Sequence, residues 1–193
     1  FMGPHKNFWK KIYEPIIRKA AGLGKPPKEF KAVSTHLYHN VDITIVGGGL
    51  NGLIAAKSLI DTKYSVLLID FDDQLGGILN NSNKVQSVNN QTPMDWISET
   101  VKEIENSKNI KILKNTLVTT YNYINHLIAV EDKFVGSRPL KDKVNSTLHK
   151  IRTDQVILSN GHIERFLSFQ NNDLPGIMLC SSFEKYMCRY GVI

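Results

Sequence analysis

The sequence predicts an α/β fold, in which a parallel β-sheet is covered by helices. Three observations support this prediction. Residues 42–46 form a short apolar run rich in β-branched residues, and a glycine-rich turn and a helical pattern follow it. Residues 65–70 form a second apolar run, as expected of a buried parallel strand. Residues 156–158 are a third such run, which ends in a small polar residue and a glycine.

The segments between these strands predict a helix and a β-meander. Residues 93–104 have a helical pattern, with Thr92 as the N-cap and Pro93 at the first helical position, where its missing N–H is not needed. Residues 111–120 and 121–133 read as two or three strands of a meander. Residues 135–150 are predicted to be a polar surface excursion, and residues 181–190 a last helix.

The amino-terminal residues predict a separate basic arm. Residues 8–21 carry apolar residues at helical spacing, with a break or kink at Pro15. Glycines and prolines follow, and residues 28–40 read as a connector. We therefore expect two parts: residues 1–40 as a helical arm and linker, and residues 41–193 as the α/β domain. Because neither end resembles a natural terminus, we expect a piece of a longer polypeptide, whose carboxyl-terminal part is missing.

Composition and charge restrict the class of protein. The chain has 193 residues, of which 41% are hydrophobic and 22% charged, as in ordinary globular proteins. The formal charge is +6, and the first 40 residues account for it, with eight basic residues against two acidic ones. Such an arm could touch nucleic acid or an anionic membrane, but a solvated or subunit-facing arm is the favoured reading. We expect no nucleic-acid or membrane partner, and no run reaches the roughly 18 apolar residues of a membrane helix.

Cysteines and histidines give no sign of a disulfide or a metal site. Cys180 and Cys188 lie eight residues apart in a predicted helix, too far for an undistorted disulfide. There is no C-x-x-C pair and the six histidines are scattered, so no metal ligands are predicted. Two reduced thiols are typical of a cytoplasmic protein.

The glycine-rich turn has the spacing of a dinucleotide-binding loop. Gly47, Gly49 and Gly52 form a G-x-G-x-x-G pattern between the first strand and its helix, which is the context that the chemistry requires. The first glycine permits the tight turn, and the second lets the backbone approach a pyrophosphate at the helix N-terminus. The third lets the helix and strand pack closely. Asp70 ends the second strand 18 residues after Gly52, where its carboxylate can accept hydrogen bonds from a ribose. Because it would repel a 2′-phosphate, NAD or FAD is favoured over NADP.

Two further motifs narrow the fold class. Leu75-Gly76-Gly77 closely follows the ribose acid, and the late strand ends in Ser159-Asn160-Gly161. This combination resembles the glutathione-reductase-like flavoproteins, which have a glycine doublet there and a late strand ending in Ala-Thr-Gly. The resemblance implies a Rossmann-type three-layer FAD/NAD(P)-binding domain with a β-meander.

Longer segments are more specific and resemble the alpha subunit of heterotetrameric sarcosine oxidase. The resemblance covers nearly the whole chain and rests on residues 13–24, 116–123, 126–130, 161–165, 169–179 and 186–192. It implies a complex of alpha, beta, gamma and delta subunits that demethylates sarcosine oxidatively to glycine, forms peroxide and passes a one-carbon unit to tetrahydrofolate. In that family the FAD of the beta subunit oxidises sarcosine, an FMN at the alpha–beta interface handles oxygen, and the alpha subunit holds NAD+. The resemblance thus implies that this chain holds the dinucleotide, contains no catalytic residues and is inactive alone.

The chain departs from the family at the end of the second strand. The family often has a glutamate directly after the strand-two aspartate, whereas this chain has Phe71 and then Asp72. If that glutamate binds the ribose, Asp70 and Asp72 must share its role. The candidate cofactor-binding residues are Gly47, Gly49, Leu50, Asn51, Gly52, Asp70, Phe71, Asp72, Gly76, Gly77, Val118, Ser159, Asn160 and Gly161.

Two other hypotheses remain open. One is an FAD-binding alpha subunit of a dye-linked amino-acid or opine dehydrogenase, or of a hydrogen cyanide synthase-like oxidoreductase. The segment Asn171-Asn172-Asp173 before Leu174-Pro175-Gly176 favours sarcosine oxidase over that group. The other is a nucleotide-binding scaffold that is not an enzyme and whose dinucleotide only stabilises an assembly.

Overall fold

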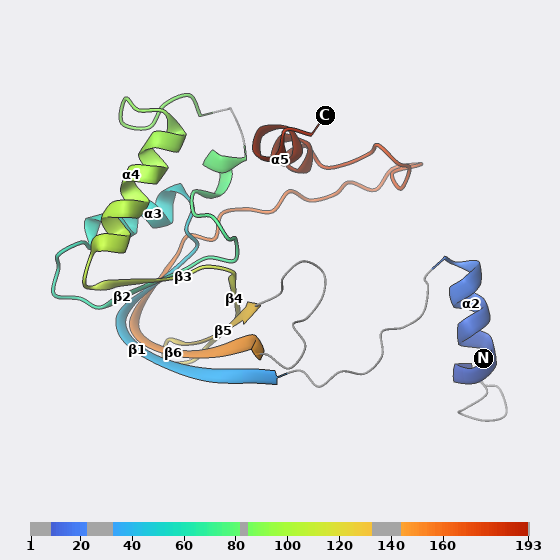
Figure 1. Ribbon diagram of the computed structural model, residues 1–193, viewed down its shortest axis with the longest axis horizontal. Helices are drawn as coiled ribbons and strands as arrows, with labels where there is room; N and C mark the ends of the chain where they lie inside the picture. The colour runs from blue at the N-terminus through green and yellow to red at the C-terminus, as the bar shows by residue number, and fades with distance from the viewer. Residues whose placement is uncertain (1–8, 23–32, 82–84, 133–143, 193) are drawn as a thin grey trace. The chain divides into compact units, whose positions relative to one another are not determined.

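The computed structural model describes residues 9–22, 33–81, 85–132 and 144–192 (Figure 1). Lys6, Lys25, Lys28 and Lys31 of the predicted basic arm lie outside the described residues, as does the first part of the predicted polar excursion. The chain divides into two compact units, Phe1–Ala32 and Val33–Ile193.

The first unit contains a short helical segment. A π-helical turn, η1 (Trp9–Tyr13), runs directly into helix α2 (Glu14–Ala20). Pro15 lies in the first turn of α2, where its missing N–H costs nothing. The break predicted at this proline is therefore the start of a new helix. The Arg18 guanidinium pairs with the Glu14 carboxylate at 2.9 Å, and no residue of α2 is buried.

The second unit is built on a mixed six-stranded sheet. Its strands are β1 (Val33–Val46), β2 (Val66–Ile69), β3 (Ile110–Leu113), β4 (Thr116–Asn122), β5 (His126–Asp132) and β6 (Val144–Leu158). Their order is β3-β2-β1-β6-β5-β4, and the first four are mutually parallel. β5 is antiparallel to β6, and β4 is antiparallel to β5, which gives the predicted meander.

Two strands are much longer than the sequence predicts. β1 begins at Val33, so the boundary drawn at residue 40 falls inside a strand rather than in a linker. β6 begins at Val144, so residues 144–150 belong to the sheet and not to a surface excursion. The two extensions pair with each other from Ser34–Ser146 to Val41–Thr153. Their hydrophobic patterns are weak, and their pairing joins segments that are distant in the sequence, which single-sequence patterns do not reveal.

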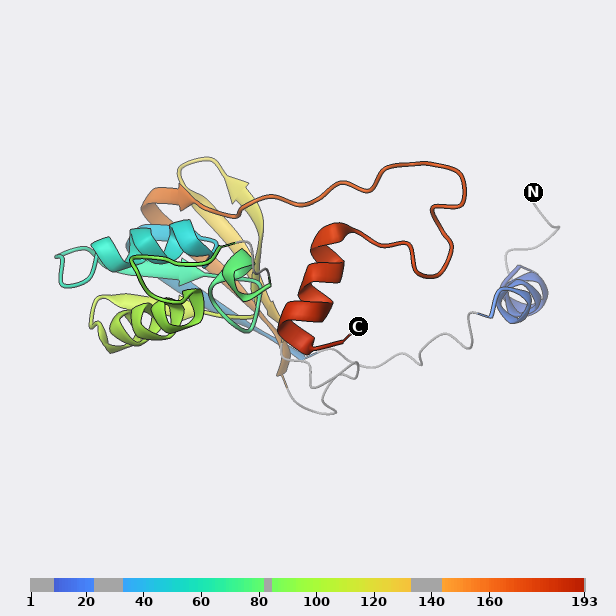
Figure 2. The same ribbon diagram turned by 90° about the horizontal axis from the view of Figure 1, so that it is seen from above.

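Helices and the meander lie on opposite faces of the parallel strands, so the unit has the predicted three layers. Helices α3 (Leu50–Ser58) and α4 (Pro93–Asn106) cover one face (Figures 1 and 2). There the sheet packs Ile45, Leu68 and neighbouring side chains against Leu53 and Trp96. On the other face, Leu67 and Ile69 of β2 share a core with side chains of β5 and β6, because the long strands curve.

Local signals in the sequence account for the remaining elements. The Thr92 hydroxyl accepts a hydrogen bond from the Asp95 N–H at 3.2 Å and caps α4, as predicted. A short 3₁₀ helix, η2 (Gly77–Asn80), follows the glycine doublet, and α5 (Cys180–Tyr190) is the last helix. Both cysteines are free. Within the described residues no helix could span a membrane and no cluster of histidine, cysteine and acidic side chains could hold a metal ion.

Candidate dinucleotide-binding site

The glycine-rich loop lies at the carboxyl edge of the parallel strands. The Gly47 N–H donates to the Ile69 carbonyl at 2.8 Å, and the Ser159 N–H donates to the Val46 carbonyl at 2.8 Å. These bonds join the ends of β1, β2 and β6 around the start of α3. In open α/β sheets, ligands bind at this edge, outside the carboxyl ends of the strands.

Three of the four glycines in the loop are required by packing. Gly47 has a φ of +104°, and a Cβ there would overlap with the Ser159 carbonyl. A Cβ at Gly48 would overlap with the side chain of Leu75, and one at Gly52 would overlap with the Gly47 carbonyl oxygen. The tight turn and the close packing around it therefore explain these three glycines without a ligand.

Gly49 is different, because packing does not require a glycine there. The nearest atom to a Cβ at this position would be the Gly77 Cα at 4.0 Å, which is ordinary van der Waals contact. Its backbone is extended, with φ −73° and ψ −170°, and any residue can adopt this conformation. Gly49 is also the N-cap of α3, and no side chain caps that end. A small residue beside an uncapped helix N-terminus fits an approaching pyrophosphate.

The step after β6 fixes the glycine loop from the other side. The Ser159 hydroxyl donates to the carbonyl oxygens of Val46 at 3.1 Å and Gly47 at 2.9 Å. Asn160 is exposed, and Gly161 follows with a φ of +66°. A serine here thus adds side-chain hydrogen bonds that the alanine of the related motif could not make.

The Asp70 carboxylate accepts hydrogen bonds from two backbone N–H groups in and beside the glycine-rich loop. One carboxylate oxygen accepts the Gly48 N–H, and the other accepts the Asp72 N–H at 2.8 Å. The residue is only 8% exposed. Burial raises the pKa of the Asp70 carboxyl, the two amide bonds oppose that rise, and the nearby Asp72 charge adds to it. Each oxygen keeps one lone pair with which it could also accept a ribose hydroxyl.

Replacing Asp70 tests this internal role. We expect Asp70→Ala to lower the free energy of unfolding by about 2 kcal/mol without any nucleotide, because two backbone N–H groups lose their acceptor. Asp132→Ala is the matched control, since Asp132 is exposed at the far end of β5, and we expect a change within about 0.5 kcal/mol. Urea unfolding of both variants measures the difference. If the two variants were equally stable, Asp70 would have no structural role.

Asp72 and Asp73, which follow Asp70 closely, contact the last helix. The sequence predicts this helix but not the contact. The Phe71 side chain is 66% exposed. The Asp72 carboxylate lies 3.5 Å from the Arg189 guanidinium and 3.9 Å from the Lys185 ammonium. Arg189 also pairs with Asp73. Asp72 is therefore part of an ion-pair cluster with α5, so the expectation that it shares the ribose role with Asp70 stays a prediction.

The ion pairs of Arg189 are expected to hold α5 in place, since none of its residues is buried. We expect Arg189→Met to increase amide hydrogen exchange throughout α5 several-fold. Lys185→Met, which removes only the contact at 3.9 Å, is the control and should change exchange little. Equal exchange in Arg189→Met and the unmodified chain would show that other contacts hold the helix.

The other predicted site residues lie in three places. The Gly76 N–H donates to the Gly48 carbonyl at 2.8 Å, and Gly77 faces Gly49, so the glycine doublet lines the same loop. Leu50 and Asn51 lie in the first turn of α3. Val118 is in β4, where it packs against the core beneath the meander. The structure brings the glycine loop, Asp70, the doublet and Ser159 together at one edge of the sheet.

Comparisons with known proteins agree with this geometry. A family described as an NAD(P)-binding Rossmann-like domain matches residues 45–112. The chain is 31% identical over 195 residues to the sarcosine oxidase alpha subunit of Rhizobium meliloti, covering all of this chain and 19% of that protein. An L-amino acid dehydrogenase from Synechocystis is 42% identical over 62 residues, covering 32% of this chain and 12% of that protein. The L-proline dehydrogenase structure from P. horikoshii superposes with a TM-score of 0.64 at 23% identity, covering 86% of this chain and 31% of that one.

The fold and the glycine loop define a Rossmann-like domain of the dinucleotide-binding type. Within this class, the chain is homologous to a portion of the sarcosine oxidase alpha subunit, as its sequence motifs predict. These matches cover most of this chain. The chain, however, spans only about a fifth of the length of these curated relatives.

Proposed function

We propose that the chain is the dinucleotide-holding part of an alpha subunit in a sarcosine oxidase complex, and that its dinucleotide is NAD+. The observation that carries the dinucleotide proposal is Gly49, the one glycine of the loop that packing leaves unexplained. Gly49 adjoins an uncapped helix N-terminus, where backbone N–H groups and the helix dipole would stabilise a pyrophosphate.

Different residues of the site would bind different parts of the dinucleotide. The backbone of Gly49, Leu50 and Asn51 would hold the pyrophosphate at the start of α3. Asp70 would accept a ribose hydroxyl with its remaining lone pairs. A 2′-phosphate would meet this buried carboxylate and its neighbour Asp72, which disfavours NADP. Val118 and the Ser159–Gly161 step would lie along the rest of the dinucleotide.

The role in the complex follows from the resemblance to the sarcosine oxidase alpha subunit. The complete assembly would oxidise a CH–NH donor, sarcosine, to glycine, with peroxide formed and a one-carbon unit passed to tetrahydrofolate. Flavin on partner subunits would supply the redox chemistry. The chain itself would hold NAD+ and support assembly of a cytoplasmic heterotetramer with beta, gamma and delta subunits. On this account the chain alone oxidises nothing.

A second candidate is FAD in the same site, with the chain in the path of the electrons. The similarity to the L-amino acid dehydrogenase favours it, because that match is 42% identical over 62 residues. The adenosine diphosphate portion is common to NAD and FAD, so Gly49 and Asp70 suit either cofactor. The part of the dinucleotide beyond the pyrophosphate distinguishes the two candidates.

Identification of the bound nucleotide tests the proposal. The protein would be purified, its visible spectrum recorded, and its ligand released with acid for mass spectrometry. Stripped protein would then be mixed with NAD+, NADP+ or FAD, and its Tm measured. We expect colourless protein, release of NAD+, and a rise in Tm with NAD+ but not with NADP+. Release of FAD, or a rise with FAD alone, would contradict the NAD+ assignment and support the second candidate.

A further inference from the structure

The long strands β1 and β6 carry a cluster of basic and aromatic side chains at the end of the sheet away from the glycine loop. Asn40 of β1, Arg152 of β6 and His126 of β5 occupy one row of the ladder. Tyr38 and Lys150 occupy a neighbouring row. Because side chains alternate along a strand, these five residues share one face, opposite the face on which Leu127 and Ile151 are buried.

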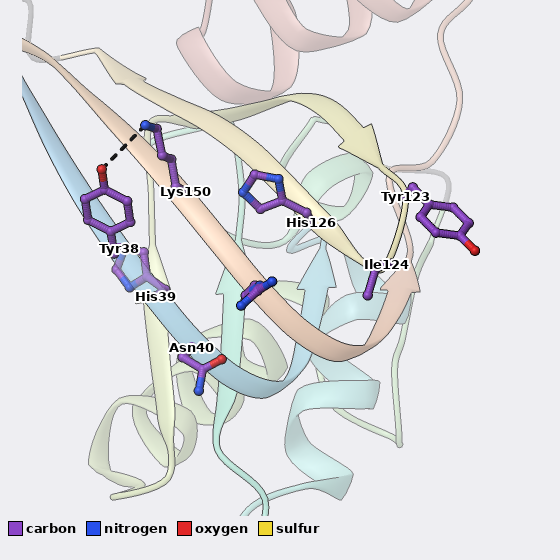
Figure 3. Close-up of a pocket in the computed structure, with 8 residues that line it drawn as sticks. Tyr38, His39, Asn40, Tyr123, Ile124, His126 and Lys150 are labelled. Carbon is purple, nitrogen blue, oxygen red and sulfur yellow. Dashed lines mark hydrogen bonds between the residues drawn. The ribbon is translucent and has the colours of Figure 1, made fainter.

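This face is hollowed. A depression of about 740 Å³ is lined by these five residues together with His39, Tyr123 and Ile124. Figure 3 shows Tyr38 and Lys150 at one end, His126 between, and Tyr123 and Ile124 of the β4–β5 turn at the other end. Tyr38, Tyr123 and Ile124 are 73%, 90% and 74% exposed, so a large apolar and aromatic surface surrounds the basic groups.

Within the described part of the chain, the cations of this hollow have no carboxylate partner, whereas other cations in the unit do. Lys57 and Lys114, for example, each pair with a glutamate. Among the residues that the structure describes, no carboxylate lines the hollow. Lys150 contacts the Tyr38 hydroxyl at 3.5 Å and lies over its ring at 5.3 Å. Among the described residues, no side chain forms an ion pair or hydrogen bond with the Arg152 guanidinium.

The nearest acidic residues along the two strands, Asp42 and Asp154, do not line the hollow. Asp42 accepts hydrogen bonds from the Ser65 N–H and hydroxyl, both at 2.7 Å, which hold its carboxylate beside the start of β2. Asp154 follows Arg152 by two residues and does not line the hollow. Two permanent cations and an imidazole thus face solvent beside aromatic rings in a unit whose total charge is nearly balanced.

We propose that this hollow is a second ligand site, separate from the dinucleotide site, and that it binds an organic phosphate. Arginine and lysine together suit a doubly charged phosphate, because the guanidinium offers paired donors and the ammonium a point charge. Asn40 and His126 supply further hydrogen-bonding groups in the same row. The rings of Tyr38 and Tyr123 would pack, by face or by edge, against the organic part of the ligand. The volume lies in the range of small-molecule sites.

Binding of phenyl phosphate tests this site. Amide chemical shifts of ¹⁵N-labelled protein would be followed during titration with phenyl phosphate and, separately, inorganic phosphate, with NAD+ present throughout at saturating concentration. We expect phenyl phosphate to move the amides of residues 38–40, 123–126 and 150–152, and to bind more tightly than inorganic phosphate. No shift in these residues, or equal affinity for the two probes, would overturn the proposal of an organic phosphate.

Variants separate the site from general charge effects. Arg152→Gln and Lys150→Met should each weaken phenyl phosphate binding about tenfold or more, since each removes a charge-assisted contact. Lys102→Met is the matched control, because Lys102 is an exposed cation on α4, and it should bind as the unmodified chain does. All three should keep their affinity for NAD+, so a defect in the dinucleotide site is recognised separately. Unchanged phenyl phosphate binding by Arg152→Gln would contradict the site.

Discussion

Gly49→Val should abolish dinucleotide binding and leave the domain folded. The branched side chain would fill the space in front of the α3 N-terminus, where the pyrophosphate is proposed to lie. The native backbone at Gly49 is extended and open to any residue, so we expect the free energy of unfolding to change by no more than about 0.5 kcal/mol. Loss of the pyrophosphate contacts should weaken binding at least about 100-fold.

Calorimetric titration of the stripped protein with NAD+, and with FAD as the alternative, measures the affinity of this variant. Urea unfolding without nucleotide provides the stability. Thr119→Val is a control of similar size in β4, at an exposed position on the meander, and should bind as the unmodified chain does. Normal binding by Gly49→Val would show that the pyrophosphate does not bind at this end of α3.

Gly52→Ala should destabilise the domain, although helix propensity alone predicts the opposite. An alanine in place of glycine inside a helix normally stabilises it by about 1 kcal/mol. Here the added Cβ would overlap with the Gly47 carbonyl oxygen and lie 2.9 Å from the Ser159 hydroxyl. Helix α3 would have to move away from β1, and we expect the free energy of unfolding to fall by about 3 kcal/mol.

Gly49→Ala is the matched control for this second prediction, because it makes the same substitution three residues earlier, where the added Cβ makes only ordinary van der Waals contact. We expect it to be as stable as the unmodified chain. Urea or thermal unfolding of the two variants, both without nucleotide, gives the comparison. A Gly52→Ala variant as stable as Gly49→Ala would mean that helix and strand are not in close contact at this glycine.

The sequence predicts the strand–helix–strand unit correctly because its signals are local. Apolar runs at residues 42–46 and 65–70 and the G-x-G-x-x-G spacing define β2, α3 and the second half of β1. Thr92 and Pro93 likewise define the start of α4. The first halves of β1 and β6 were missed because their pairing connects residues about 110 positions apart, and their side chains mix polar and aromatic types.

The candidate site, like the fold, was only partly predictable from the sequence. The glycine spacing and Asp70 are recognisable from the order of residues alone. The sequence does not show that Gly48 and Gly52 are fixed by packing while Gly49 is not, because this depends on the positions of Leu75, Ser159 and Gly77. The pairing of Arg189 with Asp72 and Asp73 also joins segments more than 100 residues apart, and no local signal could have found it.

A crystal structure of the protein with its dinucleotide tests the central claim most directly. The account predicts electron density for the pyrophosphate against the backbone of Gly49 and the first turn of α3, with the adenosine ribose beside Asp70. A pyrophosphate bound elsewhere on the sheet, with the space in front of Gly49 filled only by solvent, would contradict it.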